Sequence, residues 1–169
     1  LLYTSKKRGL CKKKPVRLNT MKKQRIIGYI ENGTVIDHIP TGKVWRVAEL
    51  LGINNKRDGR VSLGEGYESK KIGCKGILKV EGIKLLKKQI NLIAILAENA
   101  SVSEIKNGEV TNKYEIKTPR KLEGIIKCPN LGCITNDESE KVTPKINYDS
   151  KKGFNCYYCK KEFEKPGLI

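Results

Sequence analysis

The chain of 169 residues can form one domain or two small ones, and its content of 38% hydrophobic and 31% charged residues excludes a chain that is disordered throughout. No apolar run approaches the roughly 20 residues that a membrane helix needs, and the N-terminus lacks the apolar segment of a secretory signal. We therefore expect a cytoplasmic protein with no membrane partner, while the net charge of +17 raises the question of a nucleic-acid partner.

Much of the positive charge lies at the start of the chain. Residues 1–20 hold seven Lys and Arg and no acid, residues 21–120 hold 19 against 11, and residues 121–169 hold 9 against 7. The first segment has no hydrophobic period and ends just before Met21. We expect a disordered basic extension, or a translated segment upstream of a start at Met21, rather than a basic arm for nucleic acid.

Two hairpins and two further strands are expected in the next hundred residues. Asn32-Gly33 and Asn107-Gly108 each lie between β-branched runs, which is a strong signal of a two-residue turn. The expected strands are residues 25–31, 34–39, 60–63, 76–81, 101–105 and 109–116.

Two amphipathic helices are expected between these strands. In the first, apolar residues recur at helical spacing from Val44 to Leu51; Thr41 can cap it and Gly52 can end it. The second carries Leu86, Ile90, Ile93, Ala94 and Ala97 on one face. This order predicts an α+β fold, a ferredoxin-like sandwich in which an antiparallel sheet carries both helices on one face.

The segment after Arg120 contains four cysteines at the spacing of metal ligands. Cys128 and Cys133 are separated by four residues, Cys156 and Cys159 by two, and 22 residues lie between the pairs. Two such turns supply the tetrahedral thiolate shell that zinc prefers, and a closed shell of four cysteines makes the zinc structural rather than catalytic. We expect a small all-β zinc-ribbon domain, which bound zinc makes about neutral because four thiolates then carry one divalent cation.

Other uses of the cysteines are disfavoured. Two disulfides would require an oxidising compartment, and a redox role for the Cys156–Cys159 pair would require a thioredoxin-like βαβ pattern beside it. Cys11 and Cys74 have no partner at ligand spacing, so we expect free thiols.

Asp37 and the single histidine, His38, lie at the end of an expected strand. An enzyme would use them as acid and base, but adjacent strand residues point to opposite faces and no nucleophile is evident nearby. A surface pair is the simpler interpretation on spacing alone.

Four sequence blocks resemble the regulatory chain of aspartate carbamoyltransferase: NGTVIDHIP from Asn32, SKKIGCKGILKVEG from Ser69, CPNLGCITN from Cys128 and CYYCKKEF from Cys156. Their order and spacing agree with that family from about Met21 to Phe163. The resemblance implies a nucleotide effector-binding domain at 21–117 and a zinc-binding domain at 121–169 that contacts the catalytic chain. It also implies a regulatory-chain homodimer, CTP and ATP as effectors, with Mg²⁺ as their counter-ion, and no catalysis by the chain itself.

The resemblance also implies particular nucleotide contacts. Asp37 would hold the ribose hydroxyls, His38 and Lys113 the phosphates, and Lys79 the base carbonyl and the ribose. The full implied set is Ile30, Asp37, His38, Lys79, Ser103, Ile105, Val110 and Lys113, with backbone groups near Ile30 and Ile105 at the base edge. Ser103 stands where the family often has Asn, and Gly108 replaces an aromatic residue near the base pocket.

A nucleic-acid-binding zinc-ribbon protein is the alternative. The total charge and the Tyr157-Tyr158 pair favour it, but residues 121–169 carry a net charge of only +2 before zinc binds. The distribution of charge along the chain therefore favours a regulatory chain, with no nucleic-acid partner, over a nucleic-acid-binding protein.

Overall fold

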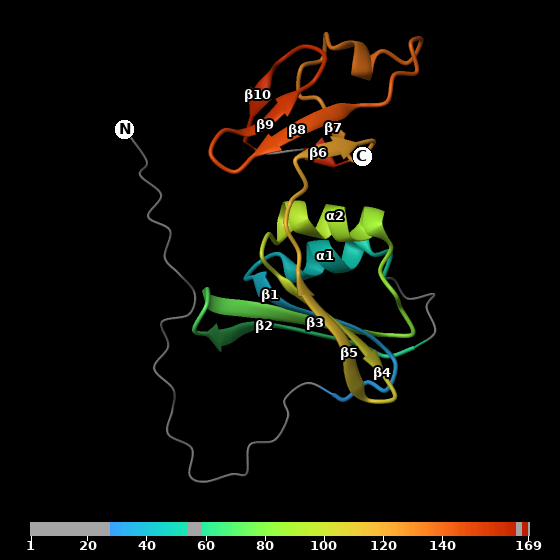
Figure 1. Ribbon diagram of the computed structural model, residues 1–169, viewed down its shortest axis with the longest axis vertical. Helices are drawn as coiled ribbons and strands as arrows, with labels where there is room; N and C mark the ends of the chain where they lie inside the picture. The colour runs from blue at the N-terminus through green and yellow to red at the C-terminus, as the bar shows by residue number, and fades with distance from the viewer. Residues whose placement is uncertain (1–27, 54–58, 165–166, 169) are drawn as a thin grey trace. The chain divides into compact units, whose positions relative to one another are not determined.

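A computed structural model of the chain describes residues 28–53, 59–164 and 167–168 (Figure 1). The expected extension at 1–20 and the first part of the strand expected at 25–31 lie outside these residues. The described chain forms two compact units: one runs to Lys84 and includes Ala100–Glu115, and the other comprises Leu85–Asn99 and the part from Ile116 onward. The domain boundaries implied by the resemblance stay a prediction.

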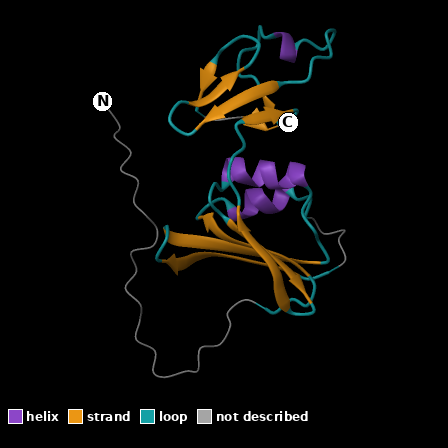
Figure 2. Ribbon diagram, in the orientation of Figure 1, coloured by secondary structure: helices purple, strands orange, loops and turns teal. Residues whose placement is uncertain are grey.

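The first unit is built on a five-stranded antiparallel sheet with the order β2-β3-β1-β4-β5 (Figures 1 and 2). Its central strand, β1, pairs with β3 on one side and β4 on the other. The strands are β1 (Gly33–Pro40), β2 (Val61–Ser69), β3 (Gly73–Glu81), β4 (Ser101–Lys106) and β5 (Glu109–Glu115).

Helix α1 (Val44–Leu50) lies against the buried face of this sheet. Val44 is fully buried, and a Cβ added at Gly76 of β3 would lie 2.0 Å from the Val44 Cγ2 atom. Ile36 of β1 and Leu78 of β3 are also fully buried on that face. The absence of a side chain at Gly76 therefore allows the helix to approach the strand closely, and apolar burial stabilises the contact.

The hairpin expected at Asn32-Gly33 is not formed. Residues 28–30 are not in a strand, and the strand partners of β1 come from β3 and β4 instead. Gly33 has a φ of +149°, and a Cβ there would lie 2.2 Å from the Val80 carbonyl oxygen. The glycine is needed for close approach to β3, so a turn signal in the sequence marks a tertiary contact here.

The cap expected at Thr41 is also wrong, although the expected end of the helix is confirmed. The residue before α1 is Lys43, which makes no capping side-chain hydrogen bond. A carboxylate from β2 takes that role: Glu65 Oε1 accepts from the amides of Gly42 and Val44, both at 3.0 Å. Gly52, at a φ of +66°, follows the last turn.

The second unit contains helix α2 (Lys87–Leu96) and a small all-β region (Figure 2). Four strands pair in the order β10-β9-β8-β6, and β11 pairs with β7. The elements are β6 (Lys121–Glu123), β7 (Ile126–Lys127), a 3-10 helix η1 (Ile134–Asn136), β8 (Lys145–Asp149), β9 (Gly153–Cys156), β10 (Glu162–Phe163) and β11 (Gly167–Leu168).

The core of this unit is small. Leu122, Ile126 and Ile146 are almost fully buried around three of the cysteines, and Leu92 and Ile95 of α2 pack against the same cluster. The fold class expected from the sequence is confirmed: an α+β arrangement with an antiparallel sheet and two helices, followed by a small all-β region. Among the described residues, the helices are all too short and too polar to cross a bilayer.

Candidate metal centre and nucleotide site

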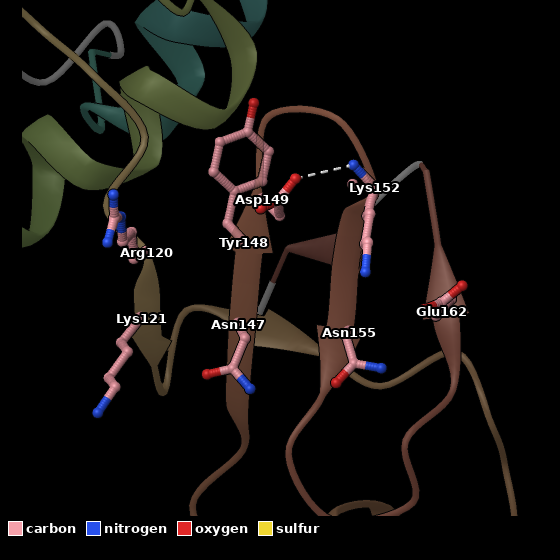
Figure 3. Close-up of a pocket in the computed structure, with 9 residues that line it drawn as sticks. Arg120, Lys121, Asn147, Tyr148, Asp149, Lys152, Asn155 and Glu162 are labelled. Carbon is pink, nitrogen blue, oxygen red and sulfur yellow. Dashed lines mark hydrogen bonds between the residues drawn. The ribbon is translucent and has the colours of Figure 1, made fainter.

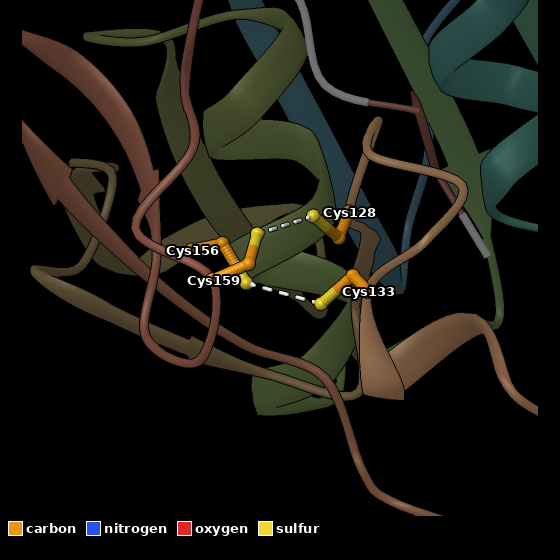
Figure 4. A group of neighbouring side chains, drawn as sticks. All are labelled: Cys128, Cys133, Cys156 and Cys159. Atoms are coloured by element: carbon orange, nitrogen blue, oxygen red, sulfur yellow. Dashed lines mark hydrogen bonds between the residues drawn. The ribbon is translucent and has the colours of Figure 1, made fainter.

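Two loops bring the four C-terminal cysteines together (Figure 4). Cys128 and Cys133 flank the turn between β7 and η1, and Cys156 and Cys159 flank the turn between β9 and β10. Their sulfur atoms all lie within 4.8 Å of one another, with Cys128 Sγ 3.5 Å from Cys159 Sγ and Cys133 Sγ 3.8 Å from Cys156 Sγ. Zinc at about 2.3 Å from four tetrahedral thiolates would separate the sulfurs by about 3.8 Å, so the arrangement fits this ion.

Hydrogen bonds hold the first of these loops in shape. Asn136 Nδ2 donates to the carbonyl oxygens of Cys128 (2.9 Å) and Asn130 (2.8 Å), and the amide of Cys133 donates to Asn130 O at 3.0 Å. Thr135 Oγ1 donates to Cys133 Sγ at 3.3 Å. Such contacts behind the ligands orient thiolates toward a common centre.

The surroundings oppose the ionisation of two of the four cysteines. Burial raises the pKa of the Cys128 thiol to about 12 and also raises the pKa of Cys156. The pKa of the Cys159 thiol, whose sulfur accepts from the Lys161 amide, is instead lowered to about 6. A bound divalent cation supplies the charge that four adjacent thiolates require, which is how a metal ion and this buried cluster stabilise each other.

The other two cysteines do not behave as expected. Cys74 is disulfide-bonded, so the prediction of a free thiol is wrong for this residue. Spacing along the chain could not reveal this, because a disulfide depends on proximity in the fold. Cys11 lies outside the described residues. The four clustered cysteines themselves are unpaired.

A row of side chains crosses the other sheet on the face opposite its buried core. Val35 of β1 is paired with Lys79 of β3 and Ser103 of β4, and Ser103 is paired with Lys113 of β5. Directly paired residues of antiparallel strands point to the same face. The register therefore brings three of the predicted nucleotide residues, Lys79, Ser103 and Lys113, to one surface.

Asp37 and His38 lie at an irregularity of β1. The register between β1 and β3 shifts between Ile36 and Ile39, and His38 has a φ of +62°. As a result, His38 Nδ1 is 3.5 Å from Asp37 Oδ2, and the His38 amide donates to Asp37 Oδ1 at 2.7 Å. The expectation that these neighbours point to opposite faces is wrong, because a β-bulge interrupts the alternation.

Lys75 of β3 is a contact that the sequence interpretation missed. Its Nζ lies 2.8 Å from Asp37 Oδ2, and both side chains are largely buried. The available signal was its spacing: Lys75 and Lys79 are four residues apart on one strand, so both point to the same face as Val35.

The remaining predicted residues lie at the end of the sheet near the β4–β5 turn. Ile30 is buried, whereas Val110, paired with Ile105, is exposed. The segment before β1 runs past them: Lys79 Nζ donates to Gly28 O at 3.0 Å, and the Gly108 amide donates to Glu31 O at 2.7 Å. This segment therefore places Ile30 between Lys79 and the β4–β5 turn.

A polar cavity of about 470 Å³ lies on the outer face of the four-stranded sheet in the second unit (Figure 3). Lys121, Asn147, Asn155 and Glu162 form one paired row across β6, β8, β9 and β10. None of these residues was singled out from the sequence. The row holds one cation, two amides and one carboxylate, so it offers no uniform charge to a ligand.

Comparison with known proteins identifies the family of each part. Residues 25–117 match the model of the allosteric domain of the aspartate carbamoyltransferase regulatory chain, and residues 120–168 match the model of its metal-binding domain.

Curated relatives are named as regulatory chains of aspartate carbamoyltransferase. The aspartate carbamoyltransferase regulatory chain of Korarchaeum cryptofilum is 39% identical over 88% of this chain and 96% of its own length. The regulatory chain of Pyrobaculum arsenaticum is 40% identical over 88% and 100%, and that of Pyrococcus horikoshii is 41% identical over 85% and 95%.

Proposed function

Because the chain belongs to the family of aspartate carbamoyltransferase regulatory chains, we propose that residues 21–117 bind CTP and ATP and that residues 121–169, folded around one zinc ion, contact a catalytic chain. The observation that carries the nucleotide part is the row of Lys79, Ser103 and Lys113 on one face of the sheet, beside Asp37 and His38.

The chemistry of this face suits a nucleoside triphosphate. The Asp37 carboxylate is oriented by Lys75 and by the His38 amide, and its remaining lone pairs can accept hydrogen bonds from the two ribose hydroxyls. Lys113 supplies positive charge, Lys113 and His38 both supply hydrogen-bond donors for phosphate oxygens, and Lys79 lies between the ribose and the base. Mg²⁺ would arrive with the phosphates, which usually provide several of its ligands.

The zinc-binding region offers a surface for a protein partner. Leu131 is 90% exposed, Tyr157 is 53% exposed and Ile134 is 44% exposed, all three within two residues of a clustered cysteine. Apolar side chains held in place but not buried are typical of protein interfaces. We propose that this surface, defined by Leu131, Ile134 and Tyr157, contacts the catalytic chain. Edge strands β2 and β5 leave backbone groups available for a homodimer contact.

The chain is proposed to have no catalytic activity of its own. Ser101 Oγ and Asp37 Oδ2 both approach the same nitrogen of His38, Nδ1, each at 3.5 Å. A serine nucleophile and an orienting carboxylate must use different ring nitrogens, so these three residues are not arranged as a catalytic triad. The cytoplasm is the proposed location, where the four clustered cysteines, which are unpaired, would be available to zinc.

Regulation requires the nucleotide to distinguish two states of the complex. An effector that bound both equally would shift nothing, and typical coupling free energies are about 1 to 3 kcal/mol. We propose that the nucleotide bound by residues 21–117 biases the packing of regulatory on catalytic chains.

Calorimetric titration of the full chain with CTP and with ATP tests the nucleotide proposal. We expect saturable binding of both, weakened about tenfold or more by Asp37→Asn and by Lys113→Gln, since each removes a charged hydrogen-bonding partner. Lys127→Gln, an exposed substitution in the other unit, is the control and should bind as the unmodified chain does. Absence of nucleotide binding, with a salt-sensitive gel shift instead, would favour the nucleic-acid alternative.

A further inference from the structure

The turn between β4 and β5 leaves room for an aromatic ring that comes from elsewhere in the chain. Gly108 has a φ of +78°, and a Cβ added there would lie 1.4 Å from the hydroxyl oxygen of Tyr29 and 2.6 Å from its Cζ. The phenol of Tyr29 therefore occupies the space that a side chain at position 108 would need.

Hydrogen bonds fix the backbone on both sides of Tyr29. The Gly108 amide donates to Glu31 O at 2.7 Å, and the Asn107 amide donates to Asn32 Oδ1 at 3.1 Å. On the other side, Lys79 Nζ donates to Gly28 O at 3.0 Å. The position of the ring is thus set by the hydrogen-bonded residues that flank Tyr29 in the sequence, and not by burial in an apolar pocket.

The Tyr29 ring is positioned but not covered. Its exposed fraction is 50%, and the exposed side chain of Val110 follows two residues after the turn. This half-exposed aromatic ring directly follows Gly28, whose carbonyl oxygen accepts from Lys79 of the proposed site, and it presents a flat surface to a planar ligand. Nucleobases stack on such rings because every base has a π-face.

We propose that Tyr29 is a specificity-determining residue whose ring forms the stacking wall for the base of the bound nucleotide, and that Gly108 is required to admit it. This inference rests on the proposed function and deepens it. The aromatic surface is supplied by the segment before β1, and it distinguishes ligands that carry a base from base-free triphosphates.

The loss of affinity that follows when alanine replaces an aromatic residue stacked on a base is known from other proteins. Tyr29→Ala should weaken CTP and ATP binding by about 5- to 150-fold, whereas Tyr29→Phe, which keeps the ring, should retain binding within about threefold. Gly108→Ala should weaken binding in the same direction, because its methyl group displaces the phenol. Combined with Tyr29→Ala, it should add little, since both changes remove one contact.

The test is calorimetric titration of the full chain and its variants with CTP, ATP and ribose 5-triphosphate. Ribose 5-triphosphate has no base, so its affinity should be unchanged by Tyr29→Ala; unchanged affinity also shows that the site remains folded. Trp45→Ala, which removes a similarly exposed aromatic ring from α1, is the matched control.

Three results would overturn the proposal while leaving the proposed function intact: unaltered CTP and ATP binding by Tyr29→Ala, an equal loss for ribose 5-triphosphate, or a loss in Tyr29→Phe as large as in Tyr29→Ala. Failure of the unmodified chain to bind any of the three ligands would overturn the proposed function and this inference together.

Discussion

Asp37 is held by more partners than its place in the sequence indicates. Lys75 and the His38 amide each contact one of its carboxylate oxygens, at 2.8 and 2.7 Å. The carboxylate is therefore fixed before any ligand arrives, and preorganisation of this kind lowers the entropic cost of binding.

The first prediction concerns the ion pair of Lys75 and Asp37. Lys75→Met should weaken CTP and ATP binding by about tenfold, because a hydrogen bond to a charged group contributes about 1.5 to 3 kcal/mol and Asp37 would lose its orientation. Lys71→Met is the control, since Lys71 pairs with Glu115 among exposed side chains, where ion pairs contribute little. Calorimetric titration measures both variants, and equal affinities for Lys75→Met and the unmodified chain would contradict the orienting role.

The second prediction concerns the cysteine cluster. Cys133→Ser should abolish stoichiometric zinc binding, measured by atomic absorption on the purified chain, and should destabilise the second unit, whose core surrounds the cluster. Cys74→Ser, compared with the unmodified chain under reducing conditions that open the disulfide of Cys74 in the latter, should keep one zinc per chain. Retention of one tightly bound zinc by Cys133→Ser would refute the four-ligand assignment.

At the level of single residues, the sequence predicted what depends on local spacing. Cys128 and Cys133 are ligands at a fixed distance along one turn, so their pattern alone indicates chemistry. The contact between Asp37 and Lys75 depends on the register of β1 against β3 and on the bulge at His38. The spacing of Lys75 and Lys79 could place both on one face of β3, but no spacing along the chain encodes the register, so Asp37 could not be predicted as the partner.

At the level of elements, one N-terminal cap is supplied from a distant strand. Glu65 of β2 binds the amides of Gly42 and Val44 at the start of α1, where unpaired N–H groups and the helix dipole both favour a carboxylate. Thr41 is close in sequence and has the chemistry of a cap, but Glu65 reaches the amides instead. A cap from another strand cannot be identified by local sequence signals.

The third prediction follows from this cap. Glu65→Ala should lower the free energy of unfolding by about 1 kcal/mol, the usual cost of losing an N-terminal cap, as measured by chemical denaturation. Glu68→Ala, a change of the same type on the same strand, should have an effect within about 0.5 kcal/mol of zero. Equal effects of the two substitutions would show that the Glu65 contact does not stabilise α1.

The two Asn-Gly pairs explain why one hairpin was predicted correctly and the other was not. At Asn107-Gly108 both residues have positive φ, of 51° and 78°, which is the conformation of a type I′ hairpin turn. At Asn32-Gly33 only the glycine has positive φ, and its value of 149° belongs to a strand end pressed against β3. The same dipeptide serves two purposes, and only tertiary pairing decides between them.

At the level of the whole molecule, we propose that the bound metal connects folding to assembly. The second unit has few large buried side chains apart from those around the cysteine cluster, so metal binding contributes directly to its folding. The exposed residues Leu131, Ile134 and Tyr157 are held on the same loops as the ligands. The shape of the proposed docking surface therefore depends on the metal.

The fourth prediction is that zinc removal releases the catalytic chain. Treatment of the assembled complex with a mercurial that binds thiolates, followed by size-exclusion chromatography, should separate the two chains in step with measured zinc loss. Re-addition of zinc after removal of the mercurial by excess thiol should restore co-elution. A complex that stays intact after complete zinc loss would show that the metal does not maintain the docking surface.

The central claim is that a nucleotide bound to this chain changes the activity of a separate catalytic chain. The most direct measurement is the rate of carbamoyl transfer as a function of aspartate concentration, for the catalytic chain alone and for its complex with this chain, with and without CTP or ATP. We expect at least one nucleotide to shift the curve of the complex and neither to shift that of the catalytic chain alone. Superimposable curves for a complex shown to bind nucleotide would contradict the account.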